Sequence, residues 1–167
     1  ARRSAMMAVK VLKGDFDADP EFYARFRREA EIASQLQHRH IVEALDFNTL
    51  PDGAPYLVLE LLRGERLRQR LQRGPVRLAE TVAIARQIAA GLHAALGQGV
   101  VHSDLKPENV FLCQVETDEG VHAKILDFGL SRILSGGTAL TRAGAVFGTP
   151  LYMSPEQANG LPAGAAS

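Results

Sequence analysis

The chain has 167 residues, 46% of them hydrophobic, and its 19 basic and 19 acidic residues give a formal net charge of zero. A chain of this length and composition can bury the core of one domain, and low-complexity disorder is not indicated. The balanced charge provides no global field that would favour a nucleic acid or a membrane surface as a partner. No apolar run approaches the ~20 residues of a transmembrane helix, and no secretory leader is visible.

Cysteine use and the first residue bear on the compartment and on completeness. Cys113 is the single cysteine, so no intramolecular disulfide can form, and we expect a cytoplasmic protein in a reducing compartment. The apolar neighbours of Cys113 predict a buried structural thiol. Because the chain begins with Ala1 rather than a methionine, we expect it to be a piece of a longer protein.

The N-terminal segment predicts a strand followed by a helix. Residues 6–12 form a short run of strand formers that is interrupted only by Lys10. Asp19 as N-cap and Pro20 at the first helical position then predict a helix that runs to about Gln37. One face of this helix is apolar and is expected to pack on the core: Phe22, Phe26, Ala30, Ala33 and Leu36.

The next elements are two strands and two helices. Apolar runs at 41–47 and 56–61 predict strands, with a turn signal at 50–53 between them. A short helix follows around Leu67, and a longer one is predicted at 78–96. The apolar face predicted for the longer helix comprises Leu78, Val82, Ala85, Ile88, Ala89, Leu92 and Leu96.

The last part of the chain predicts short strands and a long loop. Strands are expected at 100–102, 109–115 and 121–126, and the segment from residue 130 onward resembles a long exposed loop. The order of the elements indicates an α+β protein. A mainly β first part and a mainly α second part would meet at a hinge near residues 60–64.

A cluster of polar residues near the middle of the chain carries the chemistry. The stretch 102–109 reads His-Ser-Asp-Leu-Lys-Pro-Glu-Asn, and Asp127 follows its last residue by 18 positions. The carboxylates of Asp104 and Asp127, the amine of Lys106 and the amide of the asparagine can together hold a nucleoside triphosphate, its metal ions and a hydroxyl acceptor. An Asp and an Asn at this spacing are weak evidence alone, since both residue types are common in turns.

Five motifs in a fixed order make chance agreement very unlikely. They are Lys10, Glu29, the stretch 102–109, Asp-Phe-Gly at 127–129 and the segment 148–156. Together they resemble the catalytic set of a protein kinase, and the last segment is similar to that of bacterial Hanks-type (eukaryotic-like) Ser/Thr protein kinases. The resemblance implies a bilobal kinase fold that is truncated at both ends.

The resemblance also implies two domains. A partial β-rich N-lobe with the hinge would cover residues 1–62. A partial helical C-lobe with the catalytic and activation loops would cover residues 63–167.

The predicted roles follow from phosphoryl transfer, which requires positioning and charge compensation rather than covalent chemistry. A lysine in an apolar strand needs a carboxylate partner, and for Lys10 the candidate is Glu29, with Glu31 as a competitor. In the family this pair orients the α- and β-phosphates. The resemblance makes Asp104 the general base or hydroxyl-orienting group and Lys106 the cation that neutralises the γ-phosphoryl group.

Metal and adenine ligands are implied by the same resemblance. The side chains of Asn109 and Asp127 would bind Mg²⁺, which needs only one or two protein ligands beside phosphates and water. The adenine of ATP would be bound between two side chains and by two backbone groups beyond the gatekeeper Leu59. These residues are Ala8 and Phe111, the carbonyl of Glu60 and the N–H of Leu62. His102 is expected to be a packing residue.

Three features depart from the family. The glycine-rich loop, G-x-G-x-x-G, is absent because Lys10 lies too near the start of the chain, and the chain ends eleven residues after Glu156. Ser103 replaces the usual arginine, which binds a phosphorylated activation loop through charge-assisted bonds. We therefore expect weak or no activity from this fragment alone and little control by loop phosphorylation.

The predicted reaction is the transfer of the ATP γ-phosphate to a Ser or Thr hydroxyl of a protein substrate, in signalling. The stretch 106–109 and Gly148-Thr149 favour Ser/Thr over Tyr as the acceptor. One alternative is a pseudokinase or nucleotide-binding interaction module. A less favoured alternative is a small-molecule phosphotransferase, which shares the His-x-Asp, Asn and Asp frame but not Lys106-Pro107-Glu108.

Overall fold

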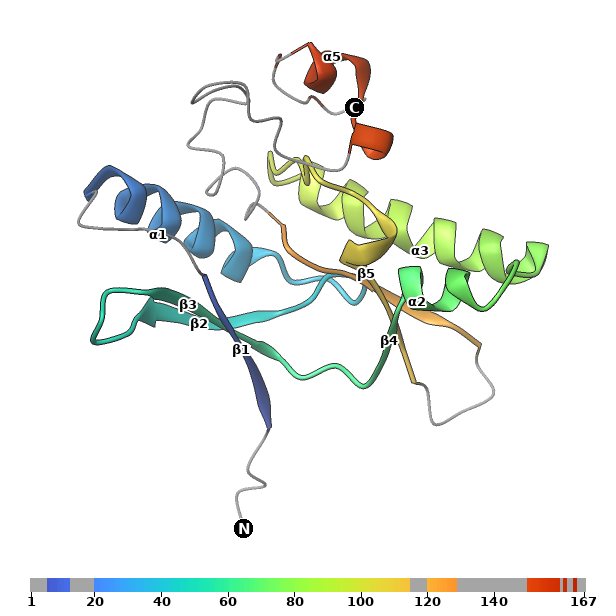
Figure 1. Ribbon diagram of the computed structural model, residues 1–167, viewed down its shortest axis with the longest axis horizontal. Helices are drawn as coiled ribbons and strands as arrows, with labels where there is room; N and C mark the ends of the chain where they lie inside the picture. The colour runs from blue at the N-terminus through green and yellow to red at the C-terminus, as the bar shows by residue number, and fades with distance from the viewer. Residues whose placement is uncertain are drawn as a thin grey trace.

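The computed structural model describes residues 6–12, 20–114, 120–128, 150–159, 161 and 164. In the first helix, the side chains of residues 20–22, 25 and 29 also lie outside this description. The elements (Figure 1) are β1 (Met7–Val11), α1 (Pro20–Gln35), β2 (Ala44–Thr49), β3 (Pro55–Glu60), β4 (Gly64–Arg66), α2 (Leu67–Gln72), α3 (Leu78–Leu96), the 3-10 turn Pro107–Asn109, β5 (Val110–Cys113), β6 (His122–Ile125), the 3-10 turn Pro150–Tyr152 and α5 (Pro155–Ala158). No helix among the described residues is long and apolar enough to cross a membrane.

The first sheet positions Lys10. Its strands lie in the antiparallel order β1-β3-β2. Side chains alternate between the two faces of a strand, so β1 exposes Val9 and turns the half-buried Lys10 to the other face. Lys10 lies opposite Leu57, which packs in one buried cluster with Phe26 and Ala30 of α1. Because directly opposed residues share a face, Lys10 lies on the side of the sheet that α1 covers.

The second sheet positions the polar stretch that precedes β5. Its strands lie in the antiparallel order β4-β5-β6, and α3 lies along it (Figure 1). Ile84 of α3 packs with Val110, Leu112 and Ala123 of the sheet. The amide side chain of Gln87 reinforces this contact, because it donates to the Val121 carbonyl and accepts from the Ala123 N–H, each at 2.7 Å.

The segment between α1 and β2 joins the two sheets. The Val42 N–H donates to the Ile125 carbonyl, and the Ile125 N–H donates to the His40 carbonyl, each at 2.9 Å. Leu36, Ala95 and Ile125 are buried together with Phe128 in the cluster at this junction. A buried connection of this kind holds the end of β6, and therefore Asp127, close to the first sheet.

Most predicted elements are confirmed. The helix predicted at 78–96 has these bounds, and α1 ends at Gln35, two residues before the predicted end. The strand predicted at 41–47 begins only at Ala44, because Ile41 forms an isolated bridge to Ile125 instead. The short strand β4 was not predicted. The loop expected from residue 130 lies outside the described residues as far as 149, and beyond that point the structure has a 3-10 turn and α5 instead of a continuous loop.

The strand predicted at 100–102 is wrong. These residues belong to no strand. The Val100 N–H turns back to the Ala95 carbonyl at 3.0 Å and closes the end of α3. His102 is held through its side chain, so the apolar run at this point serves packing rather than sheet pairing.

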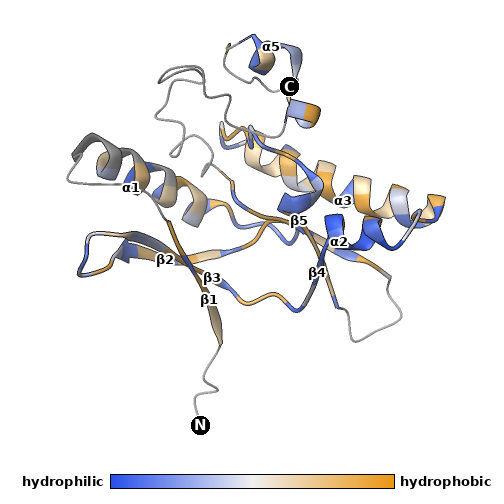
Figure 2. Cartoon of the chain, in the orientation of Figure 1, coloured by the Kyte–Doolittle hydropathy of each residue, from blue (hydrophilic) through white to orange (hydrophobic). Residues whose placement is uncertain are grey.

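The face predicted for α3 is wrong in part. Ile84, Gly91 and Ala95 are the buried residues of the helix, whereas Leu78 is 79% exposed. The small residues let α3 approach the junction closely, since a Cβ on Gly91 would lie 3.1 Å from the His40 carbonyl oxygen. Apolar residues occur along much of α3 (Figure 2), so periodicity alone could not select the buried face.

The predicted environment of Cys113 also needs a correction. The thiol lies on β5 but is half-buried rather than buried. Partial burial raises the pKa of the Cys113 thiol, despite the opposing effect of Lys124. The thiolate is therefore disfavoured, which agrees with a structural role.

Candidate active site

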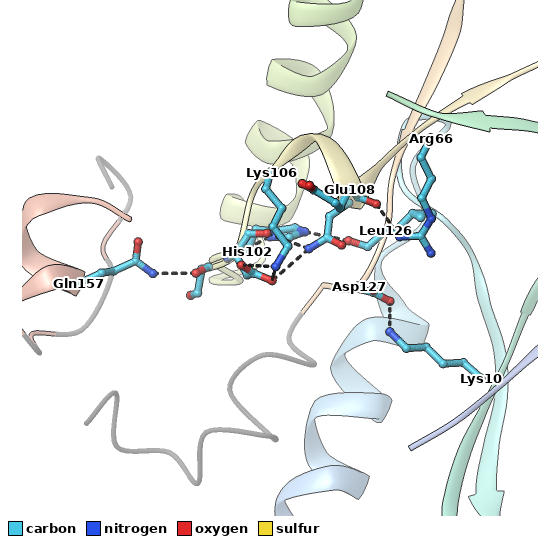
Figure 3. Close-up of polar contacts among 11 residues, drawn as sticks. Lys10, Arg66, His102, Lys106, Glu108, Leu126, Asp127 and Gln157 are labelled. Carbon is cyan, nitrogen blue, oxygen red and sulfur yellow. Dashed lines mark hydrogen bonds and ion pairs between the residues drawn. The ribbon is translucent and has the colours of Figure 1, made fainter. Parts of the chain in front are cut away.

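Lys10 and Asp127 form an ion pair at the centre of the site. The Lys10 Nζ lies 2.6 Å from Oδ1 of Asp127, although the residues are 117 positions apart in the sequence (Figure 3). Asp127 follows β6 and has a φ of 61°, a left-handed conformation that is uncommon outside glycine. Strained backbone of this kind clusters at functional sites. The strand β1 supplies the amine and the end of β6 supplies the carboxylate.

Asp104 is the centre of a second polar group, on the loop before β5. The Lys106 Nζ lies 3.0 Å from its Oδ1 and 2.8 Å from its Oδ2. The Asn109 Nδ2 donates to the Asp104 carbonyl at 2.9 Å and to its Oδ2 at 3.1 Å. Asn109 is buried and ends a 3-10 turn that begins at Pro107. This turn brings the amine and the amide around a single carboxylate.

His102 and Leu126 link the two polar groups. The Leu126 N–H donates to the Asn109 carbonyl at 2.8 Å. The His102 Nε2 forms a hydrogen bond with the Leu126 carbonyl, also at 2.8 Å. Leu126 immediately precedes Asp127. The N–H and the carbonyl of Leu126 are therefore both bonded to the stretch 102–109, which sets the position of Asp127 relative to this stretch (Figure 3).

The prediction that His102 is a packing residue is confirmed. Its side chain is buried, and its ring meets that of Phe128 edge-on with centroids 4.7 Å apart. Burial lowers the pKa of His102, although the bond to the Leu126 carbonyl opposes this effect. The Asp104 N–H donates to its Nδ1 at 3.3 Å, so the neutral ring carries its proton on Nε2. Both nitrogens have structural partners.

The partner predicted for Lys10 cannot be compared with the structure. Glu29 lies on α1, but its side chain lies outside the described residues, and the pair stays a prediction. The competitor Glu31 bonds instead to Arg27 at 3.2 Å on an exposed face of α1.

The residues predicted to bind adenine lie on both sheets. Ala8 is opposite Leu59 in the first sheet, and Phe111 is opposite Lys124 in the second. The side chains of Ala8 and Phe111, which are predicted to contact the adenine, are half-buried, and Leu62 is half-buried as well.

Sequence reasoning missed the side-chain role of Glu60. Its carboxylate forms an ion pair with Lys124 and accepts the Glu43 N–H at 2.9 Å. The carboxylate therefore connects the first sheet to β6. No local sequence signal predicts this contact, because Lys124 is 64 positions away.

Arg66 and Glu108 are further contacts that sequence reasoning missed. The Arg66 guanidinium donates to the Glu108 carbonyl at 2.7 Å, and Arg68 lies 3.6 Å from the Glu108 carboxylate. These bonds attach the start of the strongly hydrophilic α2 (Figure 2) to the turn that carries Asn109. An arginine-rich helix beside a motif acid is the signal that could have indicated them.

The donor atoms fit a hard cation. The Nδ2 of Asn109 is bonded to Asp104 and Oδ1 of Asp127 to Lys10, so the amide oxygen and the second carboxylate oxygen are the atoms left for a metal. Mg²⁺ prefers oxygen ligands and takes only one or two from the protein when it binds with phosphates. The two residues suit this chemistry.

The larger of the two cavities described is not lined by the ion-paired residues. A cavity of about 350 Å³ is lined by Leu92 and Leu96 of α3, by Leu105 and by Gln157 of α5, and not by Lys10 or Asp127. A smaller hollow adjoins Leu59, Asp127 and Phe128. The ion pairs and the bonds to Asp104 identify the candidate site better than cavity size does, because they involve every predicted polar group with a described side chain.

The comparisons with known proteins agree with this geometry. The family model described as "Protein kinase domain" matches residues 1–167. Serine/threonine-protein kinase pkn3 of Myxococcus xanthus is 43% identical over 159 residues, which cover 93% of this chain and 29% of that protein. Serine/threonine-protein kinase PknB of Mycobacterium leprae (strain TN) is 37% identical over 158 residues, which cover 92% of this chain and 25% of that protein.

A solved structure supports the same assignment. The kinase domain of PknI from Mycobacterium tuberculosis matches with a TM-score of 0.71 and 28% identity, over 95% of this chain and 57% of that one. The chain thus spans less than a third of these curated relatives and somewhat over half of the solved domain. The predicted kinase-like α+β fold is confirmed. Since the family model covers the whole chain and the relatives are bacterial Ser/Thr kinases, the chain belongs to the protein kinase family and to its bacterial Hanks-type branch.

Proposed function

We propose that the protein carrying this chain transfers the γ-phosphate of ATP to a serine or threonine hydroxyl of a protein substrate. The observation that supports the proposal is the pair of bonds through Leu126, which connects the residue before Asp127 to His102 and Asn109 of the stretch that carries Asp104. One carboxylate then faces the acceptor while the other, with Lys10, faces the nucleotide. Phosphoryl transfer depends mainly on such positioning and on charge compensation.

The nucleotide would be held by groups from both sheets. Lys10, with Glu29 as its family partner, would bind phosphate oxygens, and Asn109 and Asp127 would hold Mg²⁺. The purine would lie between Ala8 and Phe111 and bond to the backbone of Glu60 and Leu62. When bound, ATP would supply the phosphoryl group, and its Mg²⁺ would neutralise part of the negative charge of the phosphates. With the purine at Glu60 and Leu62, the hinge would close a partial N-lobe of residues 1–62, and residues 63–167 would form the partial C-lobe.

The acceptor hydroxyl would be oriented by Asp104. Its carboxylate can accept the hydroxyl proton, and the Asn109 amide holds Asp104 through one bond to its backbone carbonyl and one to its carboxylate. The amine of Lys106 lies 2.8 Å from Oδ2 and can neutralise charge on the group that is transferred. The supply of ATP and the absence of a possible internal disulfide favour the cytoplasm as the site of action.

The test is phosphorylation of a protein substrate by the full-length protein and by its Asp104→Asn variant. We expect the variant to bind ATP as the parent does and to lose about 10²–10⁴ in kcat, the usual contribution of a positioned base. ATP binding without transfer by the parent protein would favour a nucleotide-binding module. Transfer to a small molecule alone would favour a phosphotransferase. Unchanged kcat in the variant would show that Asp104 is not the base.

A further inference from the structure

Gln157 of α5 bonds to the residue that precedes Asp104. Its Nε2 donates to the Ser103 carbonyl at 2.7 Å, across 54 positions of sequence (Figure 3). Neither residue was a candidate for catalysis or nucleotide binding. The bond connects α5 to the stretch 102–109, which carries Asp104.

The carbonyl that accepts this bond belongs to a strained residue. Ser103 has a φ of 62°. Among the described residues, Ser103 and Asp127 are the only residues other than glycine with a positive φ. Serine does not favour this conformation, which persists where surrounding contacts determine it. Its own hydroxyl contributes little, since it lies 3.5 Å from the Val101 carbonyl.

The peptide group between Ser103 and Asp104 is held at both ends. Gln157 bonds to its carbonyl oxygen, and His102 Nδ1 accepts its N–H at 3.3 Å. A peptide group is planar, so these two bonds set its orientation. That orientation in turn determines the direction in which the Asp104 side chain leaves the backbone.

The side chain of Gln157 is itself preorganised. Its Oε1 accepts the Ser154 N–H at 3.1 Å, while the backbone N–H of Gln157 donates to the Ser154 hydroxyl at 3.4 Å. This reciprocal capping box directs the remaining Nε2 toward the loop. Glutamate would complete the same capping box but could not donate to the Ser103 carbonyl. Only the amide serves both partners.

We propose that Gln157 is a positioning residue that holds the Ser103–Asp104 peptide and thereby directs the Asp104 carboxylate toward the acceptor. Through it, the placement of α5 is coupled to the catalytic loop. This inference rests on the proposed kinase function, because it assigns a catalytic consequence to the contact.

The test compares Gln157→Glu with Asn159→Ala in the full-length protein. The first variant keeps the cap and removes one bond. The second removes a similar amide-to-carbonyl bond, Asn159 Nδ2 to Pro155 O at 2.8 Å, from the same helix but not from the loop. We expect kcat to fall about tenfold or more in Gln157→Glu, since small displacements of reacting groups are costly. KM for ATP should stay within about twofold, and Asn159→Ala should match the parent.

A second substitution separates positioning from general damage to α5. Asparagine adopts the left-handed conformation more readily than serine, so Ser103→Asn should restore part of the kcat lost in Gln157→Glu. Equal kcat in Gln157→Glu and Asn159→Ala would overturn the inference. So would a loss in Gln157→Glu that Ser103→Asn leaves unchanged.

Amide hydrogen exchange tests the contact without relying on catalysis. We expect faster exchange at residues 102–106 in Gln157→Glu than in Asn159→Ala. If the parent protein transfers no phosphate and exchange still differs, the proposed function is wrong while the contact is supported. If the parent is active and neither exchange nor kcat changes, only the inference is wrong. Global unfolding of Gln157→Glu, measured by circular dichroism, would assign the residue to stability and also overturn it.

Discussion

Glu60, the last residue of β3, forms an ion pair with Lys124 of β6, and the side chains are only 27% and 16% exposed. The same carboxylate accepts the Glu43 N–H at 2.9 Å. One acidic side chain therefore connects the first sheet, the segment after α1 and the second sheet. Among the described residues, Lys124 of the second sheet is the one cation that pairs with this carboxylate.

Removal of Lys124 should destabilise the fold. Lys124→Met leaves a half-buried carboxylate without its cation, and we expect a loss of about 1–2 kcal/mol in the free energy of unfolding. The double variant Lys124→Met/Glu60→Gln should lose less unfolding free energy than the two single variants lose together, because the two side chains interact. Urea unfolding measures both. Arg27→Met breaks an exposed pair as a control and should cost under about 0.5 kcal/mol; equal losses would contradict the assignment.

Asp127→Asn should weaken nucleotide binding that depends on Mg²⁺. The neutral amide of Asn lacks the negative charge with which the Asp127 carboxylate attracts Mg²⁺ and Lys10. We therefore expect Kd for ATP to rise at least about tenfold, or 1.4 kcal/mol. Calorimetric titration with and without a chelator measures the effect. Asp104→Asn is the matched variant and should bind ATP as the parent does. If Asp127→Asn and the parent bind Mg-ATP equally, the metal assignment fails.

Gly91→Ala should destabilise the junction between α3 and the segment after α1. The added methyl would lie 3.0 Å from Cδ1 of Ile125 and 3.1 Å from the His40 carbonyl oxygen. Overpacking of this kind costs about 1–3 kcal/mol. Gly97→Ala is the control, since the nearest atom to its Cβ would be 3.5 Å away. Thermal unfolding should separate the two variants, and similar midpoints would show that α3 can shift.

Stability should fall on mild acidification. Burial lowers the pKa of both His40 and His102 from the ordinary value of 6.5. The folded protein keeps these rings neutral while the unfolded chain binds protons as pH falls below that value. The free energy of unfolding is therefore highest above about pH 6.5 and drops toward the folded pKa values, by at most about 1.4 kcal/mol per pH unit for each ring.

Urea unfolding between about pH 7.5 and 5.5 measures this dependence. His40→Gln should flatten the curve, because it removes one of the two rings that stay neutral in the folded protein. A free energy of unfolding that stays constant or increases on acidification would refute the prediction.

Activity should depend little on phosphorylation of the activation loop. Ser103 has no positive charge with which to bind a phosphate, whereas arginine at this position would form charge-assisted bonds. Alanine at Ser135, Thr138 and Thr141 of the full-length protein should therefore change kcat/KM by less than about tenfold, or 1.4 kcal/mol. A larger loss, measured on an unmodified protein substrate, would mean that another cation has taken over the role.

Local patterns were sufficient for the elements and for the catalytic-loop motif. The helix 78–96 was predicted with its observed bounds because apolar periodicity and the glycines after it act over neighbouring residues. The strands near Lys10 and Asp127 were predicted for the same reason. The spacing of Asp104, Lys106 and Asn109 also sufficed to group them, since residues within five positions of one another cannot lie far apart.

The contacts between distant segments were decided only by the tertiary structure. Sequence reasoning sought a partner for Lys10 on the next helix, and the described contact is with Asp127, 117 positions away. The pair of Glu60 with Lys124 and the bond from Gln157 to Ser103 had no local signal either. A sequence determines which side chains can accept or donate, but the packing of the two sheets determines which of them meet. Leu36, Ile125 and Phe128 are buried in one cluster, and this packing brings segments that are distant in the sequence together.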